Sequence, residues 1–429
     1  MAFFLSGSLY GVCRSICRVL ASGCLAALVL ATAPACMPHQ AAFAQAGATT
    51  VAYSVGLMAR ASGASLSLEL SDEVGYEVTL LSRPDRIVID LPKVVFATTP
   101  QKPGGKIGPV SAYRYGLFFA DRSRVVIDLA EPAVIDRVDS TGSDGRRRLV
   151  FHLARIDRAK FNDAVASAAR TKVAGDAPET TGRIAAVDPA TRNLPLIVLD
   201  PGHGGIDPGA IAGGGETEKG IVLPLAIAVK ERLEKAGRVR VAMTRSGDNF
   251  VSLSDRVKFA RDQKAALMVS LHADTVAFEP GVRGASIYTL SEKASDVISA
   301  RLADSENRVD QLAGVETRED TSAIDDILFD LTKRETRHFS IGLARHLAGT
   351  MTHSTSMHKN PLRAAGFRVL TAPDVPSVLI ETGYLSSAED AKQMKSIEWR
   401  TAMADAIGAA VEKFVGENAT RVTNSAAKP

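Results

Sequence analysis

Two histidines and two glutamates in the second half of the chain have side chains that can bind a metal ion. His203 lies in the glycine-rich stretch Asp-Pro-Gly-His-Gly-Gly-Ile-Asp-Pro-Gly, and His272 lies in Ser-Leu-His-Ala-Asp. Glu216 and Glu218 directly precede an expected helix. Two His and one Glu form a standard ligand set for an open catalytic zinc site, in which water completes the tetrahedron. Such a site polarises a bound carbonyl and lowers the pKa of the water to about 7.

Two other interpretations of these residues stay open. A lone histidine is more often a structural residue, and a glycine-rich loop after a strand can bind phosphate. The phosphate interpretation fails in detail, because no Gly-Lys-Ser/Thr follows the loop and the chain has no GxGxxG motif. The spacing alone therefore leaves a structural role and a zinc site as alternatives.

The elements expected around these residues form an α/β domain. From Leu194 onward, apolar runs alternate with helical stretches, which favours a mainly parallel sheet flanked by helices. The expected strands are 196–200, 239–245, 266–271, 285–290 and 377–381, and the expected helices are 219–236, 253–264 and 397–415. His203, His272 and Glu381 come at the ends of the first, third and last strands, where open α/β sheets bind ligands.

A β-rich pattern comes before this domain. Residues 50–157 contain short alternating runs separated by turn residues, which predicts a small all-β, sandwich-like domain. It has no catalytic constellation, so a binding role is the natural expectation. Residues 158–193 are rich in Ala, Thr, Gly and Pro without a sustained period, which predicts a flexible linker. Residues 417–429 are expected to form a disordered tail.

The first 44 residues have the pattern of an export signal. Arg14 and Arg18 precede an apolar segment over 19–33 that is too short and too rich in small residues to span a bilayer comfortably. A small-x-small sequence ends at Ala44, so we expect cleavage after this residue and a periplasmic protein without a stable membrane span. A retained membrane anchor is the less favoured alternative.

Composition excludes several classes of protein. Among 429 residues, 51 Lys and Arg face 48 Asp and Glu, a balance that argues against a nucleic-acid-binding protein. All four cysteines lie before Met37. The rest of the chain therefore has no cysteine-ligated zinc, cysteine nucleophile or disulfide. Cys36 as a lipidation site is disfavoured, because Pro34 lies within a poor lipobox.

Several ordered motifs resemble one known family. These are IVLDPGHGGIDPGAIAGGGETEKGIVL, MTRSGDNFVSLSDRVKFARDQKAALMVSLHAD, RAAGFRVL and PSVLIETGYLSSAED. They resemble the zinc-dependent N-acetylmuramoyl-L-alanine amidases of the family-3 type, over roughly residues 194–415. The β-rich region resembles the AMIN module that often precedes this domain and targets the enzyme to the cell wall, a weaker resemblance that rests on strand pattern and domain order.

The resemblance implies roles for individual residues. His203, Glu218 and His272 would ligate one Zn²⁺, with Glu218 preferred over Glu216 because it belongs to the Glu-Lys pair that opens the helix. Glu381 would be the catalytic carboxylate, which takes a proton from water and delivers it to the departing amine. Asp274 would be an extra ligand or would orient an imidazole.

One helical stretch, at about 291–352, is longer than in minimal members of the family. It resembles the regulatory segment of the cell-division amidases, in which a helix covers the site and an acidic side chain caps the zinc. Glu306 is the candidate for this autoinhibitory ligand, followed by Asp304. A solvated acidic helix face is the alternative. If the cap exists, a protein activator, a LytM-type factor by the resemblance, must bind the insert and shift the helix.

Together these features predict an exported peptidoglycan hydrolase that cleaves the amide between N-acetylmuramic acid and L-alanine of the stem peptide. The expected process is septal cell-wall splitting and daughter-cell separation. The catalytic domain is expected at 194–416. Two alternatives are a non-catalytic peptidoglycan-binding or scaffolding protein and a zinc peptidase that acts on stem peptides.

Overall fold

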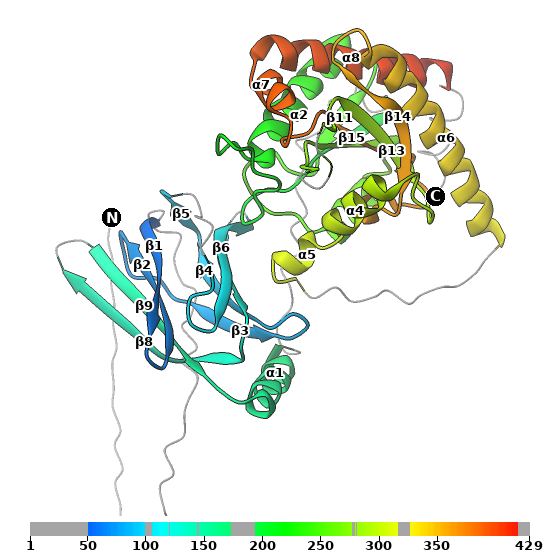
Figure 1. Cartoon of the computed structure of the whole chain (residues 1–429). Coiled ribbons are helices and arrows are strands. Elements are labelled where there is room, and N and C mark those ends of the chain that lie inside the picture. The colour runs from blue at the N-terminus through cyan, green and yellow to red at the C-terminus, as the bar shows by residue number, and fades with distance from the viewer. Residues whose placement is uncertain are drawn as a thin grey trace, which may run out of the picture. The chain divides into compact units, whose positions relative to one another are not determined.

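The computed structural model describes residues 50–98, 105–119, 121–143, 146–172, 194–276, 279, 281–315 and 327–418 (Figure 1). The expected signal peptide, its cleavage site and the last eleven residues of the expected tail, 419–429, lie outside these ranges. No helix of the described residues is long and apolar enough to cross a membrane.

The N-terminal region consists of two packed β-sheets. The five-stranded sheet has the order β5-β1-β2-β9-β8, with β1 Thr50–Arg60, β2 Gly63–Leu70, β5 Val94–Phe96, β8 Ala133–Ser143 and β9 Arg146–Arg155. The four-stranded sheet has the order β3-β4-β7-β6, with β3 Glu77–Leu81, β4 Arg86–Pro92, β6 Val110–Phe119 and β7 Arg122–Leu129. The expected all-β fold is confirmed.

Strand periodicity builds the core of this region. Alternate residues of β2, β4, β7 and β9 point inward and are fully or almost fully buried, among them Leu66, Leu68, Ile87, Ile127 and Phe151. The intervening residues point to the outer faces. The alternating runs on which the prediction rests, at 66–70, 76–81, 86–91, 124–129 and 148–153, lie in β2, β3, β4, β7 and β9, whereas β1, β5, β6 and β8 were not predicted.

The expected linker is not irregular throughout. Its first fifteen residues form helix α1, Arg158–Lys172, whose buried Phe161 anchors the start of the helix. The prediction of a flexible connector is therefore wrong for this part. This part contains several alanines, and alanine is the strongest helix former. Residues 173–193 lie outside the described ranges.

The second domain is built on a six-stranded sheet in the order β11-β10-β12-β15-β13-β14. Its strands are β10 Leu196–Pro201, β11 Arg240–Met243, β12 Leu267–His272, β13 Ala285–Leu290, β14 Met357–Ala365 and β15 Ser377–Glu381. All neighbours are parallel except β13 and β15. The α/β fold with a mainly parallel sheet is confirmed, and β14 is the strand that the sequence did not reveal.

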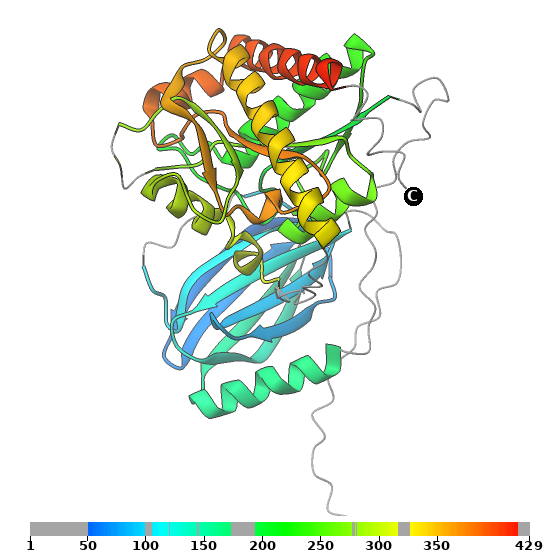
Figure 2. The ribbon, with the colours of Figure 1, turned by 90° about the vertical axis from the view of Figure 1, so that its right-hand side faces the viewer.

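Helices cover both faces of this sheet (Figure 2). α2 Glu218–Ala236, α6 Ile327–Met351, α7 Ala388–Met394 and α8 Ile397–Glu417 contribute to the core on one face, and α3 Leu253–Asp262, α4 Val297–Glu306 and the 3-10 helix η2 Arg368–Leu370 to the core on the other. The short helix α5, Val309–Leu312, follows α4. Thus α4, α5 and α6 lie in the stretch at 291–352 where helices were expected.

The sheet brings three strand ends together. In the ladder, Pro201 at the end of β10 pairs with Leu271, and His272 at the end of β12 pairs with Glu381 at the end of β15. Parallel strands end at the same edge, so residues far apart in the sequence meet there. This edge positions the candidate site.

Candidate active site and metal centre

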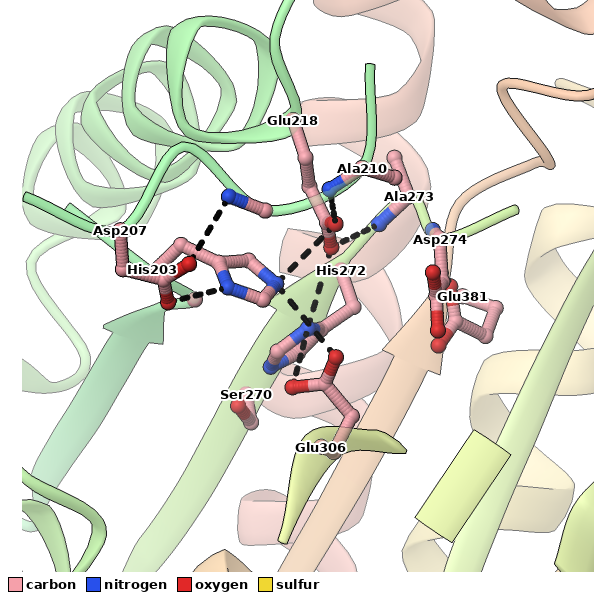
Figure 3. Close-up of polar contacts among 12 residues, drawn as sticks. His203, Asp207, Ala210, Glu218, Ser270, His272, Ala273, Asp274, Glu306 and Glu381 are labelled. Atoms are coloured by element: carbon pink, nitrogen blue, oxygen red, sulfur yellow. Dashed lines mark hydrogen bonds and ion pairs between the residues drawn. The ribbon is translucent and has the colours of Figure 1, made fainter. Parts of the chain in front are cut away.

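The loop after β10 presents His203 to the site. The backbone of His203 has a φ of 57°, a left-handed conformation that costs energy for a residue with a Cβ and is held by its surroundings. His203 as a whole residue is 4% exposed. Nδ1 lies 2.6 Å from Asp207 Oδ2 in the same loop, which leaves Nε2 to face the centre of the site (Figure 3).

Two buried arginines donate hydrogen bonds to backbone carbonyls of this loop. Arg256 of α3 donates to the carbonyls of Pro201 and His203 at 2.8 Å and pairs with Asp200 at 2.7 Å. Arg245 donates to the carbonyls of Pro201 and Gly202 at 2.9 and 2.7 Å. Burial, then the nearby charge of Arg256, lowers the pKa of Arg245 to about 10. These contacts offset the strain at His203 by fixing the backbone around it.

Glu218 is the first residue of α2 and is fully buried. Its Oε1 accepts from the backbone amide of Ala273 at 2.8 Å and its Oε2 from that of Ala210 at 2.9 Å. Burial alone would raise the pKa of this carboxyl, but the two imidazoles of His203 and His272 outweigh burial and hold it well below its usual range. Glu218 is therefore ionised, and two backbone amides fix its position.

His272 ends β12 and approaches the loop closely. Its Nδ1 lies 3.1 Å from Glu218 Oε1. A Cβ at Gly202 would come within 2.4 Å of the His272 ring, so this position requires glycine for the two elements to pack. His203 and His272, with ring centroids 5.0 Å apart, thus meet at one carboxylate.

The fourth donor is Glu306 from the end of α4. Its Oε1 lies 3.5 Å from His203 Nε2 and its Oε2 lies 3.4 Å from His272 Nδ1. Glu306 as a whole residue is 5% exposed, whereas Asp304 on the same helix is exposed. Burial raises the pKa of Glu306, and the two imidazoles oppose that rise.

The donor atoms have the spacing of a metal site. Bonds of roughly 2.0–2.1 Å at tetrahedral angles put ligand atoms about 3.3 Å apart. His203 Nε2 lies 3.0 Å from Glu218 Oε2, and the three other pairs of a histidine nitrogen with an oxygen of Glu218 or Glu306 fall between 3.1 and 3.5 Å. His203, His272 and Glu306 each offer a donor atom within 4.8 Å of the other two. His203 Nε2 is buried and forms no hydrogen bond within the described structure, as expected for a nitrogen that faces an ion. The residues therefore fit a divalent cation.

The acidic side chains around His203 favour its protonated form. Burial opposes protonation of His203, but the carboxylates of Asp207, Glu218 and Glu306 outweigh burial and raise its pKa well above the ordinary value. A metal ion must displace such a proton, so metal binding at this site competes with acid.

Glu381 lies beside this cluster at the end of β15, fully buried. Its Oε2 accepts from the backbone amide of Asp274 at 3.0 Å, and its Oε1 forms no hydrogen bond among the described residues. Burial, and then the charge of Asp274, raises the pKa of Glu381 well above its usual range. A buried carboxyl with a raised pKa is the kind of group that accepts and returns a proton during hydrolysis.

Asp274 neighbours Glu381 instead of the histidines (Figure 3). Its Oδ1 accepts from the amide of Thr275 at 2.6 Å, while Oδ2 is buried without a hydrogen bond in the described part of the chain. Burial, then the charges of Glu218 and Glu306, raises the pKa of Asp274 well above its usual range. Because Asp274 lies next to Glu381, its charge contributes to the raised pKa of the Glu381 carboxyl.

The structure thus brings together His203, Glu218, His272, Glu306 and Glu381, and distinguishes Glu218 from Glu216. Glu216 forms an ion pair with Lys395 instead. Sequence reasoning missed Asp207, Asp200, Arg245 and Arg256. The signal for Asp207 was present, since a carboxylate four residues after a candidate ligand histidine in one tight loop can reach its ring.

We expect Asp207→Asn to weaken metal binding without unfolding the domain. The carboxylate fixes the His203 ring and makes it a better donor, and loss of such a partner typically costs about 10- to 100-fold in metal affinity. Competition with a chromophoric zinc chelator measures the change. Glu216→Gln, which removes an acid that pairs with Lys395, is the control. Equal zinc affinity of Asp207→Asn and the wild type would contradict this role for Asp207.

A three-layer α/β domain in which buried His and Glu side chains meet at one edge of the sheet, with the buried carboxyl of Glu381 beside them, has the arrangement of a metal-dependent hydrolase. Comparison with known proteins specifies the family. The sequence profile described as N-acetylmuramoyl-L-alanine amidase matches residues 197–413, and that of the AMIN domain matches residues 58–153.

Relatives match both domains. The chain is 30% identical to the N-acetylmuramoyl-L-alanine amidase AmiC of Escherichia coli O6:H1, over 83% of this chain and 87% of that protein. It is 32% identical to AmiC of Neisseria meningitidis serogroup B, over 82% of this chain and 86% of that protein. The solved structure of AmiC2 of Nostoc punctiforme is 30% identical and covers 52% of this chain and 98% of that one, with a TM-score of 0.39.

The chain therefore belongs to the N-acetylmuramoyl-L-alanine amidase family and carries an AMIN domain. It is an amidase whose substrate is peptidoglycan, and the scaffolding alternative is set aside.

Proposed function

We propose that this amidase is an exported zinc enzyme that its own helix α4 holds inactive. The observation that carries the proposal is that His203 and His272 each lie within 3.5 Å of two buried carboxylates, Glu218 of the α/β framework and Glu306 of the helical insert. His203, Glu218 and His272 would be the permanent ligands of one Zn²⁺ ion. Two His and one Glu leave a position for water or substrate, which is typical of catalytic zinc.

The residues of the site have different roles in hydrolysis. Bound zinc would supply Lewis acidity to the scissile carbonyl and to the attacking water. Glu218 and the two histidines hold the reaction centre, and Asp207 orients His203. Glu381 takes the proton from the attacking water and returns it to the amine of L-alanine as the amide bond breaks. The backbone amide of Asp274 keeps the Glu381 carboxyl in place for both transfers.

Glu306 would occupy the position that water or substrate needs. Apolar packing holds α4 in place, since Leu302 and Ala303 lie in the core on that face of the sheet. Asn307, just after the helix, donates to the carbonyl of Gly366 and accepts from the amide of Arg368, both at 2.8 Å. Asp310 of α5 accepts from the amide of Leu253 at the start of α3. The blocking helix is therefore firmly docked, and its release requires an external binding energy.

A protein activator of the LytM type would supply that energy by binding the insert and favouring a conformation in which Glu306 has left the site. An export signal at residues 1–44 would deliver the enzyme to the periplasm. Its role there would be to split septal peptidoglycan as daughter cells separate. The AMIN domain ahead of the amidase domain supports a role at the cell wall, and the match to the two AmiC proteins extends over 83% and 82% of this chain.

Replacement of the blocking residue is expected to activate the enzyme. Glu306→Ala should raise the basal release of stem peptides from purified peptidoglycan at least about tenfold, because it removes a ligand that competes with substrate and so shifts the population toward the open site. Asp304→Ala on the exposed face of α4 is the matched control and should behave as the wild type. Equal basal activity of wild type and Glu306→Ala would argue against the cap.

A further inference from the structure

The two ends of the blocking helix α4 are held in different ways. The N-terminal end joins the sheet closely, because β13 ends at Leu290 and α4 begins at Val297. Asp296 caps the helix, and its Oδ1 accepts from the backbone amide and the hydroxyl of Ser299 at 2.8 and 2.9 Å. The other oxygen, Oδ2, pairs with the buried Arg363 of β14 at 3.2 Å. The helix thus begins at a side chain that is bound to the sheet.

Further contacts with β13 and β14 strengthen this end. The amide of Ser295 donates to the carbonyl of Ala364, and the amide of Ala364 donates to the hydroxyl of Ser295, both at 2.8 Å. Arg363 in turn donates to the hydroxyl of Tyr288 in β13 at 3.1 Å. These residues connect the start of α4 to two strands, and we call Ser295, Asp296, Arg363 and Ala364 the anchor.

The C-terminal end of α4 is held by contacts outside the sheet. Asn307 contacts the carbonyl of Gly366 and the amide of Arg368, which belong to a loop and to the 3-10 helix η2. Asp310 of α5 accepts from the amide of Leu253 at the start of α3 at 2.9 Å. We call Asn307 and Asp310 the latch. The latch therefore joins the helix to elements that lie around the sheet and not to its strands.

The acidic side chains of the anchor and the latch differ in how well their charge is compensated. Burial alone would raise the pKa of Asp296, but hydrogen bonds from Ser299 and the charge of Arg363 outweigh burial and lower it. Burial raises the pKa of Asp310, and the hydrogen bond from Leu253 and the charges of nearby arginines do not compensate fully. The ionised carboxylate is thus stabilised at the anchor and destabilised at the latch, so the latch is the weaker hold.

Only movement of the C-terminal end takes Glu306 out of the site. Glu306 is the last residue of this ten-residue helix. A rise of about 1.5 Å per residue puts it about 14 Å from the N-terminal end, so a tilt of about 20° around that end moves it by about 5 Å. Its oxygens lie 3.5 and 3.4 Å from His203 Nε2 and His272 Nδ1, so such a movement breaks both contacts. A tilt around the C-terminal end would leave Glu306 in place.

We propose that α4 leaves the site by pivoting on the anchor once the latch has opened. The proposal rests on the proposed function, because it specifies how the blocking helix moves. The anchor contacts persist in the closed and the open state, whereas the latch contacts exist only in the closed state. A contact that is present in both states does not change their ratio, but the loss of a contact that exists only in the closed state favours the open one.

Basal release of stem peptides from purified sacculi by the zinc-loaded mature chain tests the pivot. Asn307→Ala/Asp310→Asn should raise this release about tenfold although Glu306 is retained, the shift expected for the loss of buried hydrogen bonds that hold the closed state. Ser295→Ala/Asp296→Asn in the anchor is the matched control, since it also neutralises one acid and removes one polar side chain. It should behave as the wild type. Melting temperature and zinc content are measured for each variant, and zinc should stay at one ion per chain.

Crosslinks test the same movement directly, because all four cysteines of the chain lie in its first 36 residues and are absent from the mature protein if the export signal is cleaved. In the Glu306→Ala background, a disulfide across the latch in Asn307→Cys/Gly366→Cys should abolish the gain in activity, and a reductant should restore it. A disulfide across the anchor in Ser295→Cys/Ala364→Cys should leave the gain unchanged. Mass spectrometry verifies each disulfide.

Two results would overturn the pivot. One is activation by Ser295→Ala/Asp296→Asn that equals that of the latch variant, which would show that the N-terminal end of α4 moves as well. The other is unchanged basal release by Asn307→Ala/Asp310→Asn while Glu306→Ala is activated, which would show that the latch does not hold the closed state. Failure of the proposed function has a different signature, because Glu306→Ala itself would then show no gain over the wild type.

Discussion

Glu381→Gln should reduce stem-peptide release about 10²- to 10⁴-fold, the usual contribution of a positioned general acid and base. The amide has the same shape as the carboxyl but cannot take the proton of the attacking water. The comparison is best made in the Glu306→Ala background, where the open site gives a rate high enough to measure the loss. Rates are followed by chromatography of the released peptides.

The zinc content of Glu381→Gln should stay at the value of its parent, because the Glu381 carboxyl accepts from the amide of Asp274, and no hydrogen bond or ion pair of the described residues joins it to either histidine. Glu389→Gln, which removes an exposed acid that pairs with Arg283, is the control for the loss of one negative charge. Residual activity within a few fold of the parent would remove Glu381 from the proton transfers and require another base.

The second large effect is expected at the metal. In the Glu306→Ala background, His272→Ala should remove bound zinc and with it all measurable hydrolysis, since two protein ligands bind zinc far more weakly than three. The substitution also leaves Glu218 with one imidazole partner in place of two. Elemental analysis of the purified protein measures zinc per chain, and the wild type should hold one ion.

His353→Ala, at an exposed position outside the site, should keep both zinc and activity. The affinity of the wild type for zinc should fall as the pH falls. The carboxylates around His203 raise its pKa, so protons occupy the metal-free site over a wider range of pH and the metal must displace them. Full zinc occupancy in His272→Ala would contradict the assigned ligand set.

Much of the α/β domain could be predicted because its strands are buried and bounded clearly. The runs at 196–200 and 377–381 are continuous apolar segments of strand length, and the structure has strands β10 and β15 there. Strand β14 was not predicted, because its sequence, Met-His-Lys-Asn-Pro-Leu-Arg-Ala-Ala, contains proline and charged residues. Such residues are tolerated there because β14 is an edge strand with one neighbour.

The metal-binding residues of the site could be predicted where the residue type and its position after a strand indicate a ligand. His203 and His272 stood out because each follows a strand, and family resemblance was needed to prefer Glu218 to Glu216. The supporting residues could not be found this way. Arg256 lies on a helix whose pattern suggests a solvated arginine, and only the fold shows that its side chain is 2% exposed beneath the loop.

The most direct test of the central claim is the identity of the peptide released from purified sacculi. The activated Glu306→Ala enzyme with zinc should release stem peptides whose free amino end is L-alanine, and mass spectrometry should find the matching glycan with intact lactyl groups. Cuts between amino acids of the stem peptide, or no product even with an activator and zinc present, would contradict the assignment of this site to the amide between N-acetylmuramic acid and L-alanine.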